Sequence, residues 1–453
     1  MLDPRPITYR AEIIEPLIQH LAAGECCSIV GINGIGKTNM LQHLQRFDVI
    51  AHYITGNGEP LAFCSLDANM LAEPSGWGFF EGLTVALRVG LRTLLPEVAL
   101  QRISEEHAAI LAAYGNYPMA LRRCSNAINV ALDYTRLVII LDEFDALLPQ
   151  ISTTTLRNLR ALRDRYKYRL MYLALTRERL PTLCPDMYAE ESESFLELFS
   201  LGEEGLPPLR HEDAQRETVR FSSRYQQTIP PAEIERIIDL SGGHPSLIRT
   251  LVQVVLEYGT LSDEPRLLMR RAPNVRNECL KIWNDLSDEE QDLLWQAHHH
   301  RKLDLHDHAD LSLKGLLKPH ADGWQIFSPL LDTLVAGEIA RTASVTPNDS
   351  QPDPISINPT TQQVYYYGRE IGDQLPRLQF VLLAYLYARY GTVCSEEELY
   401  KAVYPDESEI DLSSDRIGVL VRRLSKRLQR LVPHQPKLIH TARGRGYRLG
   451  LPS

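Results

Sequence analysis

The chain has 453 residues, 44% of them hydrophobic and 23% charged, which is the composition of a globular protein of two to four domains. Its longest apolar run, LVIIL, is too short to span a bilayer, and the opening MLDPRPITYR lacks the apolar core of a secretory leader. Seven cysteines are scattered without a CxxC pair, which argues against a zinc or disulfide framework. We therefore expect a cytoplasmic protein without a membrane partner.

Charge is distributed unevenly along the chain. Residues 411–453 contain ten basic and two acidic side chains, a net charge of +8, whereas the whole chain carries −10 and residues 1–410 therefore carry −18. A basic segment at the end of an acidic body is typical of a nucleic-acid contact. The alternative is a solvated helix face, although such faces usually mix both signs.

Strands and helices alternate through the first third of the chain. Apolar runs predict strands at 26–30, 61–67, 136–144 and 169–176. Periodicity predicts helices from about 37 and over 79–95, 102–113, 117–133 and 155–166. Strands that are apolar throughout and alternate with helices imply an α/β fold, with a parallel sheet covered on both faces.

The segment GINGIGKT at 31–38 satisfies the phosphate-loop pattern G-x-x-x-x-G-K-[ST] between a predicted strand and a predicted helix. Its glycines permit positive φ, so that backbone N–H groups turn toward phosphate oxygens at a helix N-terminus. Lys37 would neutralise the β- and γ-phosphates, and Thr38 would offer its hydroxyl to Mg²⁺. The flanking strand and helix disfavour the alternative, a glycine turn formed by chance. The predicted nucleotide contacts of this segment are Gly31, Ile32, Asn33, Gly34, Ile35, Gly36, Lys37, Thr38 and Asn39.

An acidic pair follows the apolar run in LVIILDEFD. Asp142 would reach the metal through water, and Glu143 would orient and deprotonate an attacking water. Such a run can simply end a strand, but beside a phosphate loop it becomes strong evidence. Catalysis is therefore assigned to Lys37, Asp142 and Glu143. Asp145 is either a helix N-cap or a further acid near the metal, and we favour the cap.

The next predicted strand ends at Thr176 and Arg177 in LALTRERL. A polar residue there can sense the γ-phosphate, and Arg177 can contact it directly. An ordinary strand-end loop is an equally good interpretation of this arginine.

Strand signals stop after GEEGLPPLRHED, and the rest of the chain divides into smaller parts. Residues 211–270 read as helical, broken at SGGHP, and 277–340 read as a helical unit that ends in a hairpin and a helix. ASVTPNDSQPDP is the clearest linker because it is rich in Pro, Ser and Asp. The predicted domains are an ATPase core at 1–208, a helical lid at 209–272, a first winged-helix-like domain at 273–342, a linker at 343–354 and a DNA-binding domain at 355–453.

The order of phosphate loop, LDEFD strand, LTR strand end, helical lid and GGHP resembles the STAND branch of AAA+-related P-loop ATPases, and also the origin-recognition type of AAA+ initiator. The resemblance covers about 5–340. PITYRAEIIEPLIQHL is similar to the element that precedes the phosphate loop in STAND proteins, with Tyr9 in place of its glycine, then Arg10 and a later Glu12 or Glu15. The resemblance implies ATP or ADP with Mg²⁺ as ligands, and slow hydrolysis used as a switch.

In the lid segment SGGHPSLIRTL, the resemblance implies that Pro245 packs on the adenine. It also places His244 and Arg249 on the nucleotide-sensing side of the lid. Gly242–Pro245 can equally be a turn before a helix N-terminus, and the two interpretations are compatible.

The basic segment DRIGVLVRRLSKRLQRL at 415–431 has a helical period. Its apolar stripe consists of Ile417, Leu420, Val421, Leu424 and Leu428. Its opposite face, near Val419, carries Arg422, Arg423, Lys426 and Arg430. Such a helix suits the DNA major groove, although a merely soluble amphipathic helix has the same pattern.

The final motif, HTARGRGYRLG, has close glycines but lacks the Lys-Ser/Thr of a phosphate loop. Apolar residues on both sides of the glycines predict two strands around a tight turn. Together with LQFVLLAYL, SEEELYKAVY and the arginine-rich helix, this hairpin resembles the OmpR-type winged helix over about 355–450. The resemblance implies a set of contacts with double-stranded DNA: Arg416, Arg422, Arg423, Lys426, Arg430, Thr441, Arg443, Arg445 and Tyr447.

Five histidines in HHHRKLDLHDH, at 298–308, raise the question of a metal site. Adjacent histidines on a helix point in different directions, and no cysteine accompanies them. We favour a polar loop within the first winged-helix-like domain.

These motifs together predict an ATP-binding and hydrolysing switch that controls a DNA-binding domain, as in a STAND-type transcriptional regulator. The expected partners are double-stranded DNA, further copies of the chain in the ATP state, and a signalling ligand or protein that the sequence does not name. One alternative is a DNA-remodelling or loading ATPase of the initiator or transposition-regulator type. A defence-type STAND sensor is weaker, because the chain shows no nuclease, TIR or protease signature and no repeat array.

Overall fold

The chain forms two compact units, Met1–Gly337 and Glu338–Ser453. The computed structural model describes residues 5–54, 60–148, 151–183, 195–262, 264–300, 309–320, 323–343, 354–358, 363–367, 369–371, 375–404, 416–432, 436–442 and 446–450. Within these residues, no helix has both the length and the apolar character needed to cross a membrane.

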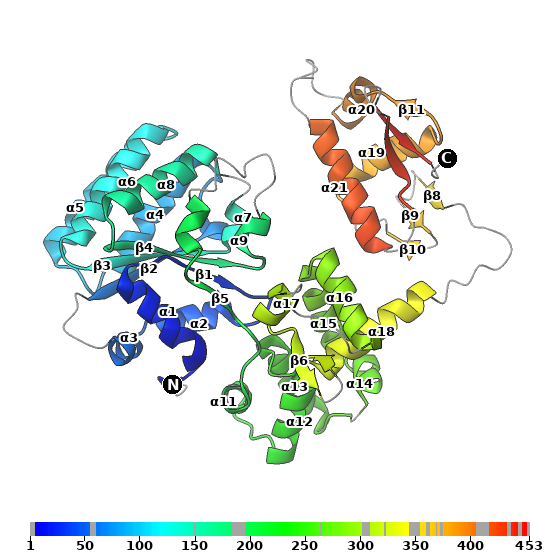
Figure 1. Cartoon of the computed structure of the whole chain (residues 1–453), viewed down its shortest axis with the longest axis horizontal. Coiled ribbons are helices and arrows are strands. Elements are labelled where there is room, and N and C mark those ends of the chain that lie inside the picture. The colour runs from blue at the N-terminus through cyan, green and yellow to red at the C-terminus, as the bar shows by residue number, and fades with distance from the viewer. Residues whose placement is uncertain are drawn as a thin grey trace. The chain divides into compact units, whose positions relative to one another are not determined.

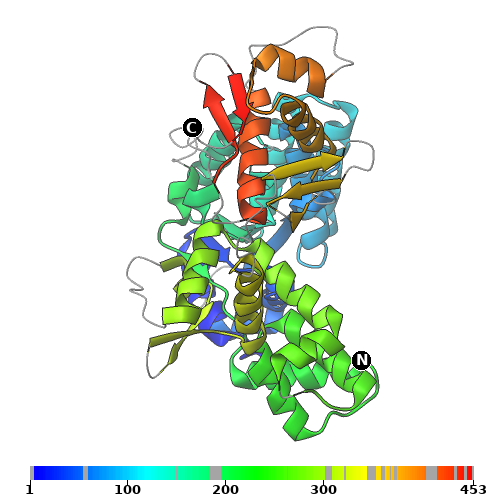
Figure 2. The ribbon, with the colours of Figure 1, turned by 90° about the vertical axis from the view of Figure 1, so that its right-hand side faces the viewer.

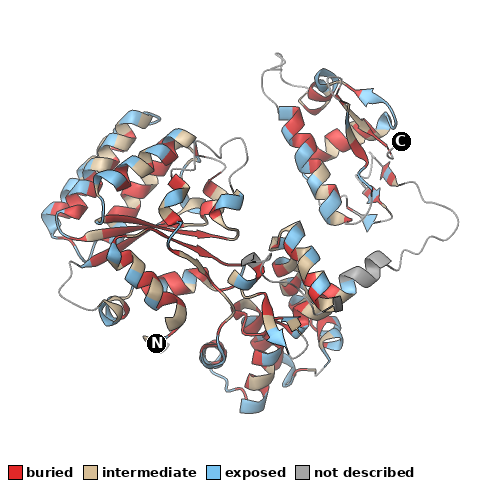
Figure 3. Cartoon of the chain, viewed as in Figure 1, coloured by how far each residue is buried: buried red, intermediate tan, exposed pale blue. Residues whose placement is uncertain are grey.

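A five-stranded parallel sheet forms the centre of the first unit, in the order β2-β3-β4-β1-β5. Its strands are β1 (Cys27–Val30), β2 (Leu61–Asp67), β3 (Arg136–Asp142), β4 (Leu170–Thr176) and β5 (Glu203–Gly205). The side chains of β1 and β4 are buried throughout, as Figure 3 shows in red, which explains why these strands lack alternation in the sequence. The predicted parallel sheet is confirmed.

Helices cover both faces of this sheet (Figure 1). One face carries α4 (Gly76–Gly90), α5 (Glu97–Ala112), α6 (Tyr117–Leu132) and α8 (Thr153–Arg165), and the other carries α1 (Ala11–Ala23), α2 (Lys37–Leu44) and α3 (Phe47–Tyr53). The short helices α7 (Phe144–Leu147) and α9 (Leu180–Leu183) follow β3 and β4. Short 3₁₀ turns lie at Ala68–Met70 and Glu197–Phe199.

The strand β5 was not predicted from the sequence. It has only three residues, Glu203, Glu204 and Gly205, so no apolar run marks it. The strand is identified by its parallel pairing with β1, in which Ser28 and Val30 lie opposite Glu203 and Gly205.

The rest of the first unit is mostly helical, and its helices gather beside the sheet in both views (green in Figures 1 and 2). The lid region contains α11 (His211–Ser223), α12 (Pro231–Ser241), α13 (Pro245–Tyr258) and α14 (Pro265–Arg271). The next part contains α15 (Pro273–Asp285), α16 (Asp288–His300), α17 (Ala309–Leu313), β6 (Leu317–His320), β7 (Gly323–Ile326) and α18 (Pro329–Ala343). The antiparallel pair β6–β7 confirms the predicted hairpin before the last helix.

His298, His299 and His300 end the helix α16, so the polar-loop interpretation was wrong at these positions; His306 and His308 lie outside the described residues. No metal-binding cluster is found in the parts of the chain that the structure describes. Of the predicted linker 343–354, only its two ends are described, and the predicted domain boundaries stay a proposal.

Where the structure describes the second unit, it contains two small antiparallel sheets and the helices α19 (Arg377–Ala388), α20 (Glu396–Val403) and α21 (Arg416–Leu431). One sheet has the order β10-β9-β8, from β8 (Ile355–Asn358), β9 (Gln363–Tyr366) and β10 (Arg369–Glu370). The other has the order β11-β13-β12, from β11 (Val393–Cys394), β12 (Ile439–Ala442) and β13 (Gly446–Leu449).

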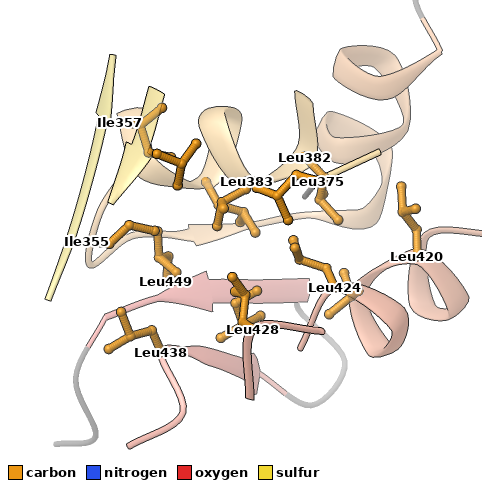
Figure 4. Close-up of a cluster of buried hydrophobic side chains, with 14 of the residues drawn as sticks. Ile355, Ile357, Leu375, Leu382, Leu383, Leu420, Leu424, Leu428, Leu438 and Leu449 are labelled. Atoms are coloured by element: carbon orange, nitrogen blue, oxygen red, sulfur yellow. The ribbon is translucent and has the colours of Figure 1, made fainter. Parts of the chain in front are cut away.

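A continuous apolar core joins these elements (Figure 4). Leu382 and Leu383 from α19, Leu424 from α21 and Leu449 from β13 are all fully buried. Ser395 begins α20 with a capping box in which its hydroxyl accepts from the Glu398 N–H while the Glu398 carboxylate accepts from the Ser395 N–H. The unit therefore has the core and caps of an independent small domain.

Candidate nucleotide site and candidate DNA-binding surface

The predicted nucleotide residues meet at one edge of the sheet. Because β1, β3 and β4 run parallel, their carboxyl ends place Gly31, Asp142 and Thr176 along the same edge. The strand β4 lies between β1 and β3, so Thr176 lies between the phosphate loop and the acidic pair. The structure therefore brings together groups that the sequence separates by more than a hundred residues.

The phosphate loop has the backbone that its glycines suggested. Gly34 and Gly36 have φ of 73° and 96°, and α2 begins directly afterwards at Lys37. Asn33 and Ile35 have acceptors for their N–H groups, whereas no described residue accepts from the N–H groups of Gly34, Gly36 and Lys37. These free donors at the start of a helix form a cradle suited to an anion.

Lys37 is buried at the base of this loop. Its Nζ donates to the Gly31 carbonyl at 2.9 Å. Burial lowers the pKa of Lys37, while the nearby carboxylates of Glu143 and Asp145 act in the opposite direction. An ammonium that is buried beside a backbone carbonyl is poised to exchange that weak partner for an anionic ligand.

The start of α13, within the region predicted as a lid, lies directly against the phosphate loop. His244 Nε2 donates to the Asn33 carbonyl at 3.1 Å, and Ser246 Oγ lies 3.1 Å from His244 Nδ1. A Cβ built on Gly34 would lie 2.5 Å from Ser246 Oγ, and one on Gly36 would lie 3.5 Å from Pro245 Cγ. A side chain at Gly34 would thus clash with Ser246 as well as strain the backbone, whereas at Gly36 only the backbone conformation favours glycine.

Arg10 connects three parts of the first unit. It is fully buried in a left-handed conformation, with φ of 50°. Its guanidinium donates to the Ile35 carbonyl of the loop and to the Pro207 carbonyl before the lid, each at 2.8 Å. Its backbone N–H donates to Asp213 of α11 at 3.0 Å. A left-handed arginine is costly, and these contacts hold it in place.

The acidic pair at the end of β3 also includes a residue with a left-handed backbone, as at Arg10. Glu143 has φ of 51°, and its N–H donates to Asp142 Oδ1 at 3.0 Å. Burial raises the pKa of Asp142, and the Glu143 carboxylate adds to this effect. Two carboxylates held together in a partly buried place are a suitable donor set for Mg²⁺ with its waters.

Asp145 has a different role from the one expected. The N-cap of α7 is Glu143, and Asp145 lies in the first turn of that helix, so the N-cap prediction was wrong. Its buried carboxylate instead accepts from Arg177 Nε at 2.5 Å. Burial opposes the charge of Arg177, but Asp145 and Asp285 raise the pKa of Arg177 above its ordinary value.

Asp285 is the residue of this site that the sequence did not reveal. At the end of α15, its Oδ1 accepts from Arg177 Nη1 at 3.2 Å and its Oδ2 accepts from the Asn33 N–H at 2.8 Å. One carboxylate is thus bound by a phosphate-loop amide and by the strand-end arginine. Those are the groups predicted to contact phosphate, and no local motif around Asp285 signals the contact.

Thr176 tests whether the site fits a nucleotide. Its side chain is fully buried, and its Oγ1 has no hydrogen-bond partner among the described residues. A buried hydroxyl without a partner is costly unless a ligand completes it. Together with the glycine cradle and Lys37, this orphaned group fits a bound triphosphate with Mg²⁺.

Some predicted residues are placed at the site without a distinguishing contact. Thr38 is exposed in the first turn of α2, and Asn39 is half-buried in the next position. Ile32 and Ile35 are buried and support the loop. Arg249 is exposed, so its sensing role rests on the resemblance alone.

In the second unit, α21 shows the predicted division into two faces. Ile417, Leu420, Val421, Leu424 and Leu428 are buried, and Val419 is 36% exposed on the other side. Arg422, Arg423, Lys426 and Arg430 are exposed there, and the alternation is visible along the helix in Figure 3. Four basic groups on one face give the helix a surface suited to a polyanion.

Arg416 is held differently from the other basic residues of α21. It donates to the Tyr400 hydroxyl at 2.9 Å, and its guanidinium lies 4.2 Å from the centre of the Tyr404 ring. This packing fixes the first turn of the helix on α20, and a phosphate contact by Arg416 stays a prediction.

The hairpin β12–β13 confirms the two predicted strands. Thr441 pairs with Tyr447, and Ala442 pairs with Gly446. Thr441 is exposed and Tyr447 is half-buried. Gly446 has φ of 120°, and a Cβ there would lie 2.0 Å from the Cys394 carbonyl oxygen. The predicted DNA contacts Arg443 and Arg445 at the tip lie outside the described residues.

Comparisons with known proteins bear on the two units differently. Residues 373–449 match the family model of the C-terminal domain of transcriptional regulatory proteins. The C-terminal unit is a winged helix of the OmpR type. The regulatory protein VanRc of Enterococcus gallinarum is 33% identical over 106 residues, which is 23% of this chain and 44% of that protein. The chain thus spans less than half the length of this curated relative.

Solved structures resemble the first unit. A Walker-type ATPase of Pyrococcus abyssi matches with a TM-score of 0.46 and 16% identity, over 74% of this chain and 99% of its own. The ORC2 protein of Aeropyrum pernix matches with a TM-score of 0.42 and 16% identity, over 75% of this chain and 97% of its own. With scores and identities this low, the similarities carry no argument about function.

Proposed function

We propose that the chain is an ATP-binding switch of the STAND type that controls the DNA-binding activity of its OmpR-type winged helix, and that it regulates transcription. The observation that carries this proposal is the phosphate loop itself. Its free amides, the buried Lys37 and the unpartnered Thr176 hydroxyl converge on one edge of the sheet, while a DNA-binding fold occupies residues 373–449.

Different residues of the site would bind the phosphates and the Mg²⁺ ion. The amides of Gly34, Gly36 and Lys37 and the Lys37 ammonium would hold phosphate oxygens, and Thr38 with Asp142 would hold Mg²⁺ and its waters. Bound Mg²⁺ supplies charge neutralisation on the phosphates. Glu143, adjacent to Asp142, would accept a proton from water. Its left-handed backbone fixes the carboxylate at the end of β3.

The lid and α15 supply the moving part of the proposed switch. His244, Ser246 and Pro245 contact the phosphate loop, and Asp285 engages Arg177 and Asn33. For Arg177 or the Asn33 amide to contact a phosphate, the Asp285 carboxylate must leave. Nucleotide binding would therefore change how α15 is held against the core, and everything that follows α15 in the chain would be affected.

Binding of a fluorescent ATP analogue tests the nucleotide site. Lys37→Ala should weaken binding on the order of 100-fold, because it removes a buried charge partner of the phosphates. Lys167→Ala, which removes an exposed lysine from the same unit, should leave binding unchanged. Equal affinity for the wild type and Lys37→Ala would contradict the nucleotide assignment.

DNA binding with and without ATP tests the coupling. A regulator of the proposed kind should bind a few promoter sites with nucleotide-dependent affinity, which genome-wide footprinting with ATP and with ADP would reveal. Broad coverage with DNA-stimulated hydrolysis would favour the remodelling or loading alternative. DNA affinity that is identical in all nucleotide states would contradict the switch.

A further inference from the structure

A short part of the first unit is basic, although the chain around it is acidic. Residues 155–169, which comprise most of α8 and the turn before β4, hold six basic side chains and one acid, a net charge of +5. Residues 1–410 carry −18 in total, so the remainder of that span carries −23. Positive charge is therefore concentrated here on a strongly negative body.

Three of these basic side chains are exposed and have no acidic partner. Arg157, Arg165 and Lys167 are exposed, and no described carboxylate forms an ion pair with any of them. The one acid of the segment, Asp164, accepts from Arg160 Nε at 2.9 Å. A solvated helix face usually mixes and pairs both signs, whereas an excess of unpaired cations is typical of a surface for an anionic partner.

Tyrosine rings accompany two of these cations. The Arg165 guanidinium lies 5.4 Å from the centre of the Tyr166 ring, and the Lys167 ammonium lies 5.4 Å from the centre of the Tyr168 ring. Contacts of this kind hold a cation near a ring without neutralising its charge. Both charges therefore stay available to a ligand.

Tyr168 is itself held in a strained and exposed position. Its φ is 67°, in the left-handed region that a bulky residue rarely adopts, yet the residue is 58% exposed. Arg136 Nε donates to the Tyr168 carbonyl at 3.1 Å, and a Cβ on Gly24 would lie 2.8 Å from the Tyr168 Cα. Burial of the ring does not explain this backbone, and strain of this kind is concentrated at functional sites. The turn therefore presents the tyrosine at a fixed place.

The turn lies at the edge of the sheet opposite the phosphate loop. It precedes β4, whose carboxyl end carries Thr176, and the Leu137 N–H of β3 donates to the Arg169 carbonyl at 2.7 Å. A second exposed tyrosine, Tyr134, is 48% exposed and lies shortly before β3. A ligand at this edge therefore leaves the nucleotide edge free.

We propose that Arg157, Arg165, Lys167 and Tyr168, the basic patch of the first unit, contact the backbone of double-stranded DNA in addition to the contacts expected of α21. Arginine and lysine side chains neutralise phosphates, and a tyrosine hydroxyl donates to a phosphate oxygen. Such contacts position a protein on DNA without reading its bases. The basic patch is therefore a second DNA contact of the chain, and it does not depend on sequence.

The choice of duplex DNA among anionic partners follows from the second unit. Residues 373–449 form a DNA-binding fold, and the chain that joins the two units gives a duplex bound there a high effective concentration at the first unit. A weak contact is then enough. The acids of the first unit repel the duplex, so the basic patch also selects the side on which this unit approaches it. The proposal rests on the DNA-binding fold and not on the proposed nucleotide switch.

Binding of a duplex of arbitrary sequence to the full-length chain, measured by fluorescence anisotropy at several salt concentrations, tests the basic patch. Arg423→Gln with Lys426→Gln serves as the background, because this pair weakens the contact by α21. In that background, Arg165→Gln with Lys167→Gln should weaken binding about fivefold to tenfold and lower the log–log salt slope by about two, since two phosphate contacts are lost.

The matched control is Arg102→Gln with Arg224→Gln. This pair removes the same charge from exposed positions on α5 and at the end of α11, and it should change neither quantity. Equal effects of the two pairs would mean that net charge alone acts on DNA, and no effect of the patch pair would mean that the patch makes no contact. Either result overturns the proposal. Thermal unfolding should be unchanged in both pairs, because all four side chains are exposed.

Amine labelling followed by mass spectrometry locates the contact without a substitution. On the wild type, bound duplex should protect Lys167 about threefold from an amine-reactive reagent, because a phosphate covers the ammonium. Lys281, which is exposed on α15, should be labelled equally with and without DNA. Equal labelling of Lys167 in the two states overturns the proposed contact.

A single-stranded oligonucleotide and polyglutamate of similar length distinguish other anionic partners. In the same background, the duplex should bind more tightly than either, and Arg165→Gln with Lys167→Gln should reduce this difference. Tighter binding of the single strand or of polyglutamate, lost in that variant, would assign the basic patch to that class of partner and overturn the duplex proposal.

Discussion

Two regions that we expect to bind anions, the phosphate loop and α21, hold their basic side chains in opposite ways. At the phosphate loop, Arg10 and Arg177 are engaged by carbonyl or carboxylate oxygens of other segments, and Lys37 is engaged by the Gly31 carbonyl of the loop itself. On α21, Arg423 and Lys426 are exposed, and no described residue partners them. A buried, prearranged set suits one compact anion, whereas an exposed row suits a long polyanion that loses its counterions on binding.

The largest expected effect concerns the acid stability of the buried region. Burial lowers the pKa of His244 to about 4 from 6.5. The folded chain therefore binds fewer protons than the unfolded chain between these values, so stability falls as pH drops from about 6.5 to 4, by up to roughly 3 kcal/mol. Calorimetric unfolding across this range should show the loss in the transition of the first unit. His244→Gln, which keeps a donor but does not titrate, should flatten the slope; an unchanged slope would contradict the burial argument.

The exposed region should respond to charge removal instead. Arg423→Gln with Lys426→Gln should weaken DNA binding by about ten- to thirtyfold and lower the log–log salt slope by about two. Arg389→Gln with Lys401→Gln removes the same charge from other parts of the unit and should change neither quantity much. Affinity measured at several salt concentrations checks both values. A salt slope that stays the same in the first pair would show that α21 does not face the phosphates.

A substitution at Asp285 would free basic and N–H groups of the phosphate-loop region from a partner, as Arg423 and Lys426 are free of described partners on α21. Asp285→Asn removes the negative charge that Arg177 and the Asn33 amide share, so affinity for an ATP analogue should rise about tenfold. Glu289→Gln, an equal charge change at an exposed position of α16, serves as the control. Weaker nucleotide binding in Asp285→Asn would mean that the carboxylate supports the site rather than competing for it.

The smallest expected effect concerns a single hydroxyl. Thr176→Val replaces a buried Oγ1 that has no partner with a methyl group of the same shape, so the first unit should gain about 1 kcal/mol of stability. If this hydroxyl contacts the γ-phosphate, the same variant should reduce the preference for ATP over ADP a few-fold. Thermal unfolding and competition binding measure the two effects. Loss of stability would indicate that Thr176 has a partner in solution.

The difference between the regions also explains what the sequence revealed. The phosphate loop and the stripe of α21 were predictable because each is a local pattern in which spacing alone specifies geometry. Asp285 was not, because its contact with Asn33 joins positions 252 residues apart. The strand β5 has no apolar residue and pairs with β1, so its pairing and not its sequence identifies it as a strand. Asp145 was misassigned because a carboxylate at a helix start has two local uses, and a distant arginine decided between them.

The packing of Ser246 and Pro245 over Gly34 and Gly36 should affect the rate of nucleotide exchange rather than the affinity for nucleotide. If the lid must lift before phosphates can leave the loop, the opening of α13 sets the pace of exchange. Release of a bound ADP should then proceed at one rate however much ATP is added, and Ser246→Gly should speed it. The nucleotide that was bound last would then stay in the site for as long as the lid stays closed.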